Sequence, residues 1–567
     1  MRLKFLFMTM IAALAFAGCS SEDDPINKGD ENTDDSYGYV AVNIVEPKSI
    51  DTRAVAGYED GTNTENNAAT ALFCVYKTDG TMQCDPRTIN LTEESGASDN
   101  NPYVEKVYKA VLVIDGVKEA DKPATNLELV CVLNAPSTLT VTKTTSLATL
   151  KQQINDYGSH TDGTFIMTNS VYKNGDMEVC GATVTGDDLK TSASDALEHP
   201  VEIYVERVVA RIQAKAGTSF GNQGATPSVD GTEKSLTINV TGIEVANIAQ
   251  KSYLFKNISG FSYGWAWDVT NKRSYWETVP LMTGDNALTF GNKSYKDIAT
   301  ETSFNITTLT NFKEYVQPNT SAQKTAILVT AQLMDGSNPA DLAYIRGGYT
   351  TKAGAKNVIL TYLQSKGYCK KVSDSPAQYT SIVADDIEWV NNEDLKAETG
   401  SGEISWLESY EVVARVKSSV TDLFINNAGT YTSTTTTVIN TDLAGTETSH
   451  PYVARVYTDG KCYYYVNIDQ SPVAGTGTTA HTYDGVIRNH IYDLTLNSIR
   501  GVGTPVFDPE DVIIPDQPTD ETLWFIGARV NVLKWRIVKT ECRFQRKLTI
   551  YPLIDQYRSS QAPILIY

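Results

Sequence analysis

The sequence has few of the residues, and none of the motifs, from which many catalytic sites are built. Only five of its 567 residues are histidines, and no two have the i, i+4 spacing of a zinc-binding helix. It contains no nucleophile elbow, phosphate-binding loop or dinucleotide-binding glycine motif. We therefore predict that the chain is not an enzyme, with no catalytic residues, no metal site and no cofactor.

Positive charge is also scarce. The chain has 48 Lys and Arg residues against 68 Asp and Glu residues, which gives a formal net charge of −20. A protein that binds nucleic acid needs a basic surface to neutralise phosphates, so this composition excludes that class of partner. After the first twenty residues the sequence has no apolar run long enough to span a bilayer.

The eight cysteines do not form a recognisable framework. None has the CxxC spacing of a zinc or redox site, and seven, an odd number, remain if Cys19 is set aside. One pairing, between Cys74 and Cys84 across a hairpin, stays open. The apolar residues around Cys74, from Leu72 to Tyr76, instead favour buried free thiols.

The N-terminus has the pattern of an export signal. Arg2 and Lys4 precede an apolar stretch at residues 5–17, which is too short to span a bilayer. The four residues that end at Cys19 resemble a lipobox, although Phe16 stands where Leu is more usual. We predict a lipoprotein signal peptide at residues 1–18 and a lipid on Cys19. An ordinary signal peptide with a chance cysteine is the alternative.

An acidic segment follows Cys19. Residues 19–36 carry seven acidic residues and one lysine, which is typical of a solvated tether. Acidic residues directly after a lipidated cysteine also resemble a signal for export to the cell surface in some Gram-negative anaerobes.

Most of the remaining chain alternates apolar and polar residues between turns that contain Asn or Gly. This pattern predicts a mainly β, sandwich-like protein with one or two short helices, at residues 146–157 and 340–346. The predicted strands lie at residues 37–45, 106–114, 127–133, 201–212, 235–245, 324–333, 452–457, 462–468, 490–499 and 524–532.

Composition shifts suggest where the chain divides. A boundary is expected near residue 215, and four prolines between residues 505 and 518 indicate an extended arm. The predicted segments are the signal peptide, a tether with a removable strand (19–53), an N-terminal sandwich domain (54–215), a C-terminal sandwich domain (216–502), and an arm with a C-terminal strand and tail (503–567).

Both ends of the chain carry an alternating strand, and together these suggest polymerisation by strand exchange. The first strand presents Val40, Val42 and Ile44 on one face, and a trypsin-like cut between Arg53 and Ala54 would release it. The strand at residues 524–532 could then fill the vacated groove of another subunit, which is β-augmentation of the donor-strand kind. The residues predicted to fill the groove are Trp524, Ile526, Ala528, Val530 and Val532. Lys48 and Arg87 are other candidate cut sites.

Several segments of the sequence resemble the fimbrillins, the type V pilins of Gram-negative gut and oral anaerobes. The similarity runs over nearly the whole chain, and residues 486–505 are its most specific part. The segments that carry it are residues 205–212 (VERVVARI), 264–272 (GWAWDVTNK), 486–492 (VIRNHIY), 499–505 (IRGVGTP) and 534–538 (KWRIV).

The resemblance implies two transthyretin-like β-sandwich domains and a structural role. On this interpretation the chain is exported as an outer-membrane lipoprotein, with palmitate on its lipid anchor. An Arg-specific protease cuts it, and copies of it join head-to-tail into a cell-surface fimbria with anchor and tip subunits. Such a fimbria supports adhesion, colonisation, biofilm and virulence.

Two other functions stay open. A tip or anchor subunit, or a surface lipoprotein adhesin that binds host glycans or proteins, is the main alternative. A glycan-active enzyme using a carboxylate pair such as Asp385 and Asp386 is a third. One feature departs from the family: a basic, aliphatic tail at residues 542–567 follows the expected C-terminal end. It is an extra strand, a processed extension or the result of a reading-frame change.

Overall fold

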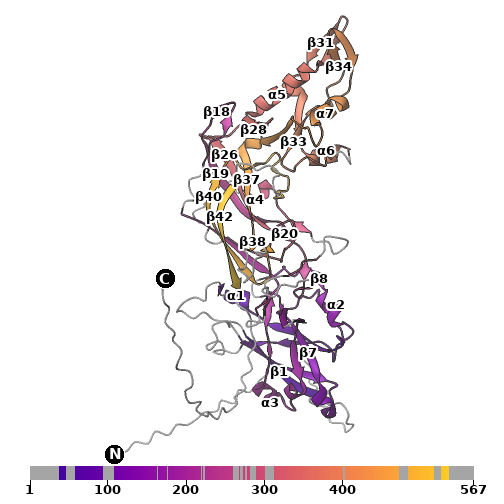
Figure 1. The fold of residues 1–567 in the computed structure, drawn as a ribbon, viewed down its shortest axis with the longest axis vertical. Helices are drawn as coiled ribbons and strands as arrows, with labels where there is room; N and C mark the ends of the chain where they lie inside the picture. The colour runs from indigo at the N-terminus through magenta and orange to yellow at the C-terminus, as the bar shows by residue number, and fades with distance from the viewer. Residues whose placement is uncertain are drawn as a thin grey trace, which may run out of the picture.

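The computed structural model confirms that the protein is mainly β (Figure 1). It describes residues 37–45, 58–59, 61–93, 107–161, 164–174, 176–218, 220, 224–259, 267–268, 273–274, 277–280, 289–299, 309, 312–399, 403–470, 483–515 and 525–535. Within these residues the strands form several sheets, and six clusters of buried apolar side chains lie on or between them.

Two sheets share the core of the first sandwich. One has the strand order β13-β1-β6-β5, and the other has the order β14-β9-β7-β3-β4 with β12 beside β7. Side chains from both sheets meet in one buried cluster that includes Val40, Leu129 and Ile203. The strands are β1 (Tyr37–Val45), β3 (Thr70–Lys77), β4 (Arg87–Asn90), β5 (Thr92–Glu93), β6 (Val107–Asp115), β7 (Asn126–Leu133), β9 (Met167–Asn169), β12 (Ala182–Thr185), β13 (Val201–Ile203) and β14 (Val205–Arg207).

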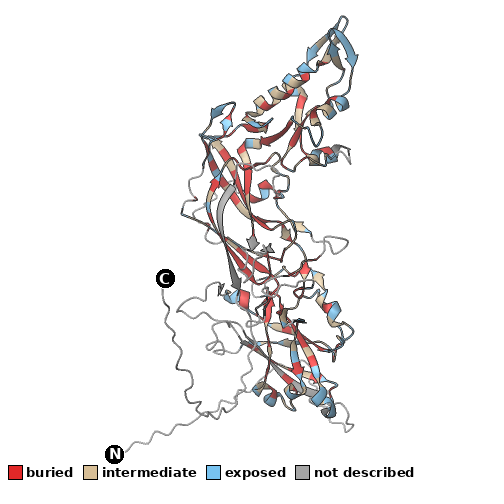
Figure 2. Ribbon diagram, viewed as in Figure 1, coloured by how far each residue is buried: buried red, intermediate tan, exposed pale blue. Residues whose placement is uncertain are grey.

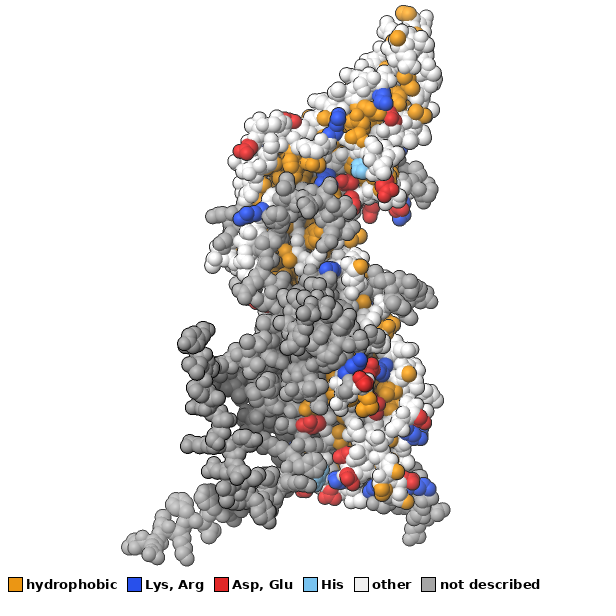
Figure 3. Space-filling model, in the orientation of Figure 1, with side chains coloured by type: hydrophobic (Ala, Val, Ile, Leu, Met, Phe, Trp, Pro, Cys, Tyr) orange, Lys and Arg blue, Asp and Glu red, His pale blue; other side chains and the backbone are white. Residues whose placement is uncertain are grey.

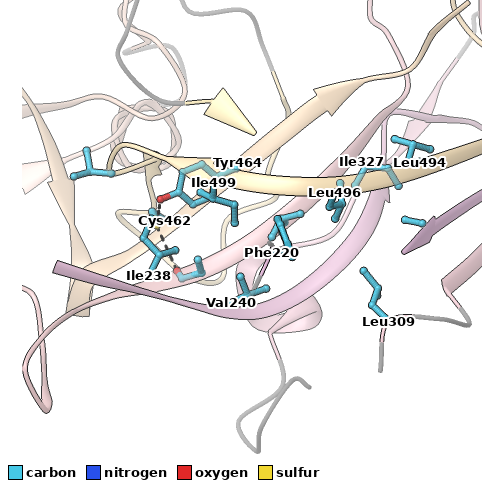
Figure 4. Close-up of a cluster of buried hydrophobic side chains, with 14 of the residues drawn as sticks. Phe220, Ile238, Val240, Leu309, Ile327, Cys462, Tyr464, Leu494, Leu496 and Ile499 are labelled. Carbon is cyan, nitrogen blue, oxygen red and sulfur yellow. Dashed lines mark hydrogen bonds between the residues drawn. The ribbon is translucent and has the colours of Figure 1, made fainter. Parts of the chain in front are cut away.

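A second pair of sheets encloses the next core. Their strand orders are β2-β42-β40-β15-β25 and β16-β19-β26-β37-β41, with β27 beside β26. Figure 4 shows Leu494, Leu496 and Ile499 of β40 in this core with Phe220 and Ile238. The strands are β2 (Tyr58–Glu59), β15 (Ala210–Ala216), β16 (Gly224–Ala225), β19 (Leu236–Ala246), β25 (Phe312–Val316), β26 (Ala326–Asp335), β27 (Asn338–Pro339), β37 (Lys461–Asn467), β40 (His490–Arg500), β41 (Thr504–Pro505) and β42 (Phe525–Trp535).

Between β27 and β37 the chain forms a third body, which we call the distal lobe (residues 342–457). Its strands belong to a sheet of order β18-β17-β29-β28-β36-β33-β32, in which β17 (Ser228–Val229) and β18 (Thr232–Glu233) come from earlier in the chain. Helices α5 and α7 pack with this sheet around a separate core, and a four-stranded sheet, β31-β30-β34-β35, extends from it. Its elements are β28 (Leu342–Ile345), β29 (Gly348–Thr350), α5 (Lys352–Ser365), β30 (Tyr368–Asp374), β31 (Ala377–Ser381), β32 (Ile387–Val390), α6 (Asn392–Thr399), β33 (Val412–Val416), β34 (Leu423–Asn427), β35 (Thr430–Ser433), α7 (Thr436–Ala444) and β36 (Val453–Tyr457).

The three bodies follow one another along the long axis of the molecule. In Figure 1, β1 and β7 lie at one end, β40 and β42 lie near the middle, and β31 and β34 lie at the other end. Figure 2 shows buried residues along the strands of the two sandwiches, whereas the sheet that ends the distal lobe is largely exposed. An elongated subunit with its N-terminal strand at one end is the result.

The helix predictions were partly wrong. The stretch at residues 146–157 is helical only in α2 (Leu147–Lys151), and residues 340–346 contain strand β28 instead of a helix. The described residues contain seven α-helices, more than the one or two predicted, and the longest, α5, was missed. Helix α5 contains Gly354 and several β-branched residues, which have low helix propensity. It forms because Thr351 caps its N-terminus and its buried face packs on the distal core.

The single strand predicted at residues 201–212 is three strands. β13, β14 and β15 each join a different sheet, so this segment carries the chain from one sheet of the first sandwich to the other and then into the second sandwich. A continuous strand cannot do this, because its hydrogen-bonding edges stay in one sheet. The apolar pattern identified the strands but not the breaks near Tyr204 and Val208.

The six described cysteines are buried free thiols. Cys74 and Cys84 are among them, so the structure does not contain the pairing that the sequence left open. Burial raises the pKa of the Cys74 thiol to about 12, which keeps it protonated and unreactive at neutral pH. Cys19 and Cys542 lie outside the described residues.

Candidate functional site

Strand β1, predicted to be removable, occupies an interior position in its sheet. It pairs antiparallel with β6 over all nine residues, from Tyr37 opposite Asp115 to Val45 opposite Val107. On its other side Val42–Ile44 pair in parallel with β13. Taking β1 out would therefore leave a slot with unpaired backbone groups along both walls, rather than a shortened sheet edge.

The walls of this slot are apolar on the core side. Val40 is 0% exposed and lies opposite Leu112, which is also buried. Residues that face each other across a β-ladder share a face of the sheet. Positions 42 and 44, which are opposite the buried Ala110 and Tyr108, therefore also lie on the core face. This agrees with the alternation of Val40, Val42 and Ile44 in the sequence.

The chain after the predicted cut site is anchored firmly. Thr62 caps α1 (Asn63–Asn66) with a capping box, and Glu65 in this helix is 0% exposed. Arg211 Nη1 lies 2.9 Å from both carboxylate oxygens of Glu65, and Lys313 Nζ lies 2.9 Å from Oε1. Arg211 belongs to β15 and Lys313 to β25, so this helix ties the segment that follows β2 to the second sandwich.

The electrostatics of Glu65 favour its charged form. Burial alone would raise the pKa of this carboxyl, but Arg211, with hydrogen bonds from Tyr315 and Lys313, lowers the pKa to about 2. Arg207 reinforces the same helix, because its Nε donates to the Glu65 carbonyl oxygen at 3.1 Å and its Nη2 donates to Asn66 Oδ1. Glu65 is thus a charged anchor at neutral pH.

The predicted donor strand, β42, is paired with its own chain. It runs antiparallel to β40 from His490 opposite Lys534 to Arg500 opposite Phe525, with one register shift between Leu496 and Ser498. Positions 528, 530 and 532 lie opposite Leu496, Leu494 and Tyr492, whose side chains are buried in the second core. By this register, positions 528, 530 and 532 are on the same face of the sheet as the buried residues of β40.

Strand β2 covers the other edge of β42. Tyr58 and Glu59 pair in parallel with Lys534 and Trp535 at the end of that strand. β2 begins five residues after Arg53, so the chain that follows the predicted cut site pairs with the predicted donor strand. β42 is accordingly flanked by β40 along its length and by β2 at its C-terminal end.

Buried ion pairs join the first and second sandwiches. Strand β21 (Ser252–Tyr253) pairs with β8 (Ile154–Asn155) of the first sandwich. Directly after β21, Lys256 Nζ lies 2.9 Å from Glu206 Oε2, with both side chains 0% exposed. Glu206 belongs to β14, and Leu254 and Phe255 beside Lys256 pack in one cluster with side chains of the first sandwich, so this pair holds the 252–258 segment there.

Arg488 completes this junction from the second sandwich. Its Nε donates to Glu277 Oε2 at 2.8 Å, and its Nη1 and Nη2 donate to the carbonyl oxygens of Leu254 and Tyr253. Two of the segments that carry the family resemblance, residues 205–212 and 486–492, thus meet at the same place. The charged residues of these segments are visible in the sequence because apolar residues surround them. Nothing in the sequence, however, identified Glu65, Lys256 or Glu277 as their partners.

Several predicted site residues lie outside the described residues. These are the lipidation residue Cys19, the cut-site residues Arg53 and Ala54, and Trp524 of the donor strand. Of the other donor positions, residues 526, 528, 530 and 532 have a described backbone in β42. No group of three or more His, Cys, Asp or Glu side chains in the described ranges has a geometry that could hold a metal ion. Among those ranges, no helix is both long and apolar enough to cross a membrane.

One part of the chain matches a known protein family. Residues 455–541 match the family model of the major fimbrial subunit protein type IV, fimbrillin, C-terminal. This confirms the fimbrillin resemblance, and the matched range contains the 486–505 segment on which that resemblance mainly rested. No curated protein sequence matches the chain.

Solved structures of fimbrial proteins are distantly similar. A fimbrilin from Porphyromonas gingivalis W83 covers 88% of this chain and 98% of its own, with 15% identity and a TM-score of 0.34. The tip fimbrial protein Mfa3 from Porphyromonas gingivalis, with a C-terminal truncation, covers 88% of this chain and 100% of its own, with 13% identity and a TM-score of 0.30. A fimbrial assembly protein from Parabacteroides distasonis covers 54% of this chain and 85% of its own, with 11% identity and a TM-score of 0.28.

Proposed function

We propose that the chain is a structural subunit of a cell-surface fimbria and that it polymerises by protease-triggered donor-strand exchange. The interior position of β1 is the observation that carries this proposal. A protease that cuts between Arg53 and Ala54 would separate β1 from the anchored helix α1. Loss of β1 would then open a slot between β6 and β13, and β42 of another copy would fill it.

The chemistry of β42 fits that slot. Its sequence places Ile526, Ala528, Val530 and Val532 on one face, the same alternation of small and β-branched apolar residues that β1 presents at positions 38 to 44. Filling the slot restores backbone hydrogen bonds on both walls, and an unpaired buried backbone group is unfavourable. Because the contact is head-to-tail and does not close on itself, repetition gives a filament.

Donation requires β42 to leave β40, so assembly exchanges one paired state for another. The two states bury similar apolar side chains and use similar backbone hydrogen bonds. The free-energy change of each assembly step is therefore a small difference between two similar paired states. Irreversible proteolytic removal of β1 drives the step toward the filament. The Pro-rich segment before β42 keeps the strand attached to its subunit, because β41 at its start pairs with β37 of the second sandwich.

The remaining features of the proposal concern the cell surface. A lipid on Cys19 holds the precursor at the outer membrane until an Arg-specific protease releases it, and anchor and tip subunits complete the fimbria. The domain division at residue 215 and the arm from residue 503 belong to the same proposal. In this role the chain has no catalytic activity, and it supports adhesion as a scaffold.

A tip subunit, an anchor subunit or a surface adhesin is the alternative function. A tip subunit needs the slot but no donor strand, and an anchor retains β1 and its lipid. The presence of both a removable strand and a strand at the C-terminus favours the shaft. The basic tail at residues 542–567 is the one feature against it, because extra chain after β42 hinders donation or caps the filament.

Limited digestion tests the proposal. The full chain without its lipid is treated with an Arg-specific protease and analysed by N-terminal sequencing and on an unboiled denaturing gel. We expect a new N-terminus at Ala54 and a ladder of heat-labile multimers. The R53A variant should give neither, whereas R87A, which removes an arginine of strand β4, should behave like the wild type.

The other outcomes separate the alternatives. Cleavage at Arg53 without a ladder contradicts the shaft role and supports a tip subunit. A repeat with the chain ending at residue 541 then shows whether the tail blocks donation. Resistance at Arg53 contradicts processing there and supports an anchor or a stand-alone adhesin.

A further inference from the structure

Two positively charged side chains on the distal lobe have no acidic partner among the residues that the structure describes. Arg346 Cζ lies 5.8 Å from the ring centroid of Tyr452, and Lys366 Nζ lies 5.4 Å from that of Tyr362. In the described part of the chain neither cation forms an ion pair, although Lys370, Lys396 and Arg455 of the same lobe all do. The whole chain has a net charge of −20, so these two exposed positive charges run against its overall sign.

The two tyrosines connect these cations. The ring centroids of Tyr362 and Tyr452 are 4.2 Å apart and their planes are inclined by 32°. Contacts therefore run from Arg346 to Tyr452, to Tyr362 and to Lys366, with a cation at each end; we call these four residues the cation–tyrosine row. Figure 3 shows hydrophobic side chains together with basic and acidic ones on the surface of the distal lobe.

The fold holds this row in place. Both tyrosines are half-buried against the distal core, so their rings are fixed from beneath while the cations are exposed. The Asp442 carboxylate lies on the buried side of the row: it accepts a hydrogen bond from the Tyr368 hydroxyl at 3.3 Å, and burial together with this carboxylate raises the pKa of Tyr362. A preorganised surface of this kind loses little side-chain entropy when a ligand binds.

Arg346 occupies a position that does not suit arginine. It forms a two-residue turn with Gly347 between β28 and β29, and both residues have a positive φ, of 51° and 81°. Such turns favour Asn or Gly at the first position, because a side chain with a Cβ is strained there. Local backbone preference does not explain why an arginine occupies this turn. The turn does, however, place the guanidinium group of Arg346 over the ring of Tyr452.

We propose that the cation–tyrosine row binds an acidic saccharide, a sugar chain with at least two carboxylate or sulfate groups. The charges require an anionic ligand, and Arg346 can bind a carboxylate with two parallel hydrogen bonds. A sugar ring has C–H groups that pack on aromatic rings and hydroxyls that stay in water, which matches half-buried tyrosines. An extended acidic peptide fits less well, because β28 and β36 are already paired on both sides and offer it no open edge.

The location suits a surface that stays accessible in a filament. Figure 1 places α5 and β28 far from β1 and its slot, so a donor strand in that slot does not cover the row. The proposal itself does not depend on strand exchange, because the row exists in the single subunit.

Affinity electrophoresis of the full chain in gels that contain polygalacturonate tests the inference. We expect retardation at low salt that weakens as salt is raised, with none in neutral dextran. Lys366→Ala and Arg346→Gly should each weaken binding about tenfold, since each removes a charge-assisted contact. Lys396→Ala, which removes a cation paired with Glu403 on the same lobe, should bind like the wild type.

Arg346→Gly also separates a binding role from a structural one. Glycine relieves the positive φ, so the melting temperature should stay unchanged or rise while binding falls. A fall in melting temperature together with unchanged binding would assign Arg346 to stability alone. The inference is also overturned if the wild type is not retarded, or if poly-glutamate of matched length binds as tightly as polygalacturonate.

Discussion

Glu65 shows how a single buried carboxylate fixes the position of a functional segment. Its side chain holds α1, and thereby the residues that follow β2, against Arg211 and Lys313 of the second sandwich. A buried charge is stable only when its partners are close and well oriented. The predicted cut at Arg53 would leave this anchor intact, so the new N-terminus stays near β42 after β1 departs.

The charge of Glu65 should make the protein sensitive to acid. Its folded-state pKa of about 2 is below the ordinary value of 4.5, so its contribution is present at neutral pH and is lost as the pH falls through that interval. The difference corresponds to about 3 kcal/mol. We expect Glu65→Gln to lower the free energy of unfolding by about that amount at pH 7, measured by urea denaturation.

The pH profile and a surface variant provide the controls. Between pH 4.5 and pH 2 the wild type should lose more stability than Glu65→Gln, because glutamine has no carboxyl group to protonate. Asp335→Asn removes an exposed ion pair with Lys234 and should change stability by less than about 1 kcal/mol. Equal effects of the two substitutions would contradict the anchor role of Glu65.

At the scale of elements, strand β42 has two possible positions. In the structure it pairs along the edge of β40, with positions 528, 530 and 532 on the face of the buried β40 residues, and in the proposed filament the same positions fill the slot of β1. A polar residue on that face should be unfavourable in both positions, whereas a change on the opposite face should matter in neither. Substitutions on the two faces of β42 can therefore test its role whether the strand is paired with β40 or placed in the slot of another copy.

We expect Val530→Asp to loosen β42 in the single subunit and to abolish the multimer ladder. Position 530 lies opposite the buried Leu494, and a carboxylate placed at an apolar core loses its hydration. Hydrogen exchange should accelerate in β42 and β40 but not in β3 and β7 of the first sandwich. Arg529→Ala is the matched control, and faster exchange in that variant would show that the face assignment is wrong.

The sequence predicted individual strands better than helices. The pattern at residues 37–45 gave the bounds of β1, and the patterns at 127–133 and 490–499 fell within one residue of β7 and β40. Apolar and polar residues alternate in these strands because one face of each strand is buried and the other is not. Helix α5 was missed because its stability comes from the cap at Thr351 and from packing of Ile359 and Leu363, which local propensity does not report.

At the scale of the whole molecule, the junction between the two sandwiches is held by charges rather than by apolar contacts alone. Lys256 with Glu206 and Arg488 with Glu277 are fully buried pairs that connect segments far apart in the sequence. A junction of this kind resists bending, since removing one partner leaves an uncompensated charge in the interior. The subunit should therefore act as a rigid unit between its two predicted exchange sites.

This rigidity predicts cooperative unfolding of the two sandwiches. The wild type should show one shared calorimetric transition for them, and Glu277→Gln should separate it into two by weakening the junction by about 3–5 kcal/mol. Glu510→Gln, which removes the exposed pair with Lys296, should leave the profile unchanged. Two transitions already present in the wild type would refute the rigid junction.

The sequence by itself determined the strand content, the alternating faces of both terminal strands and the acidic character, because these depend on residue order and composition. It also gave the fimbrillin resemblance that the match at residues 455–541 confirms. Only the tertiary structure decided that β1 lies between β6 and β13, that β42 pairs with β40, and that Arg346 and Lys366 lie on adjacent tyrosines. Alternation specifies which face of a strand is buried but not which strand lies beside it, and that choice depends on contacts between residues hundreds of positions apart.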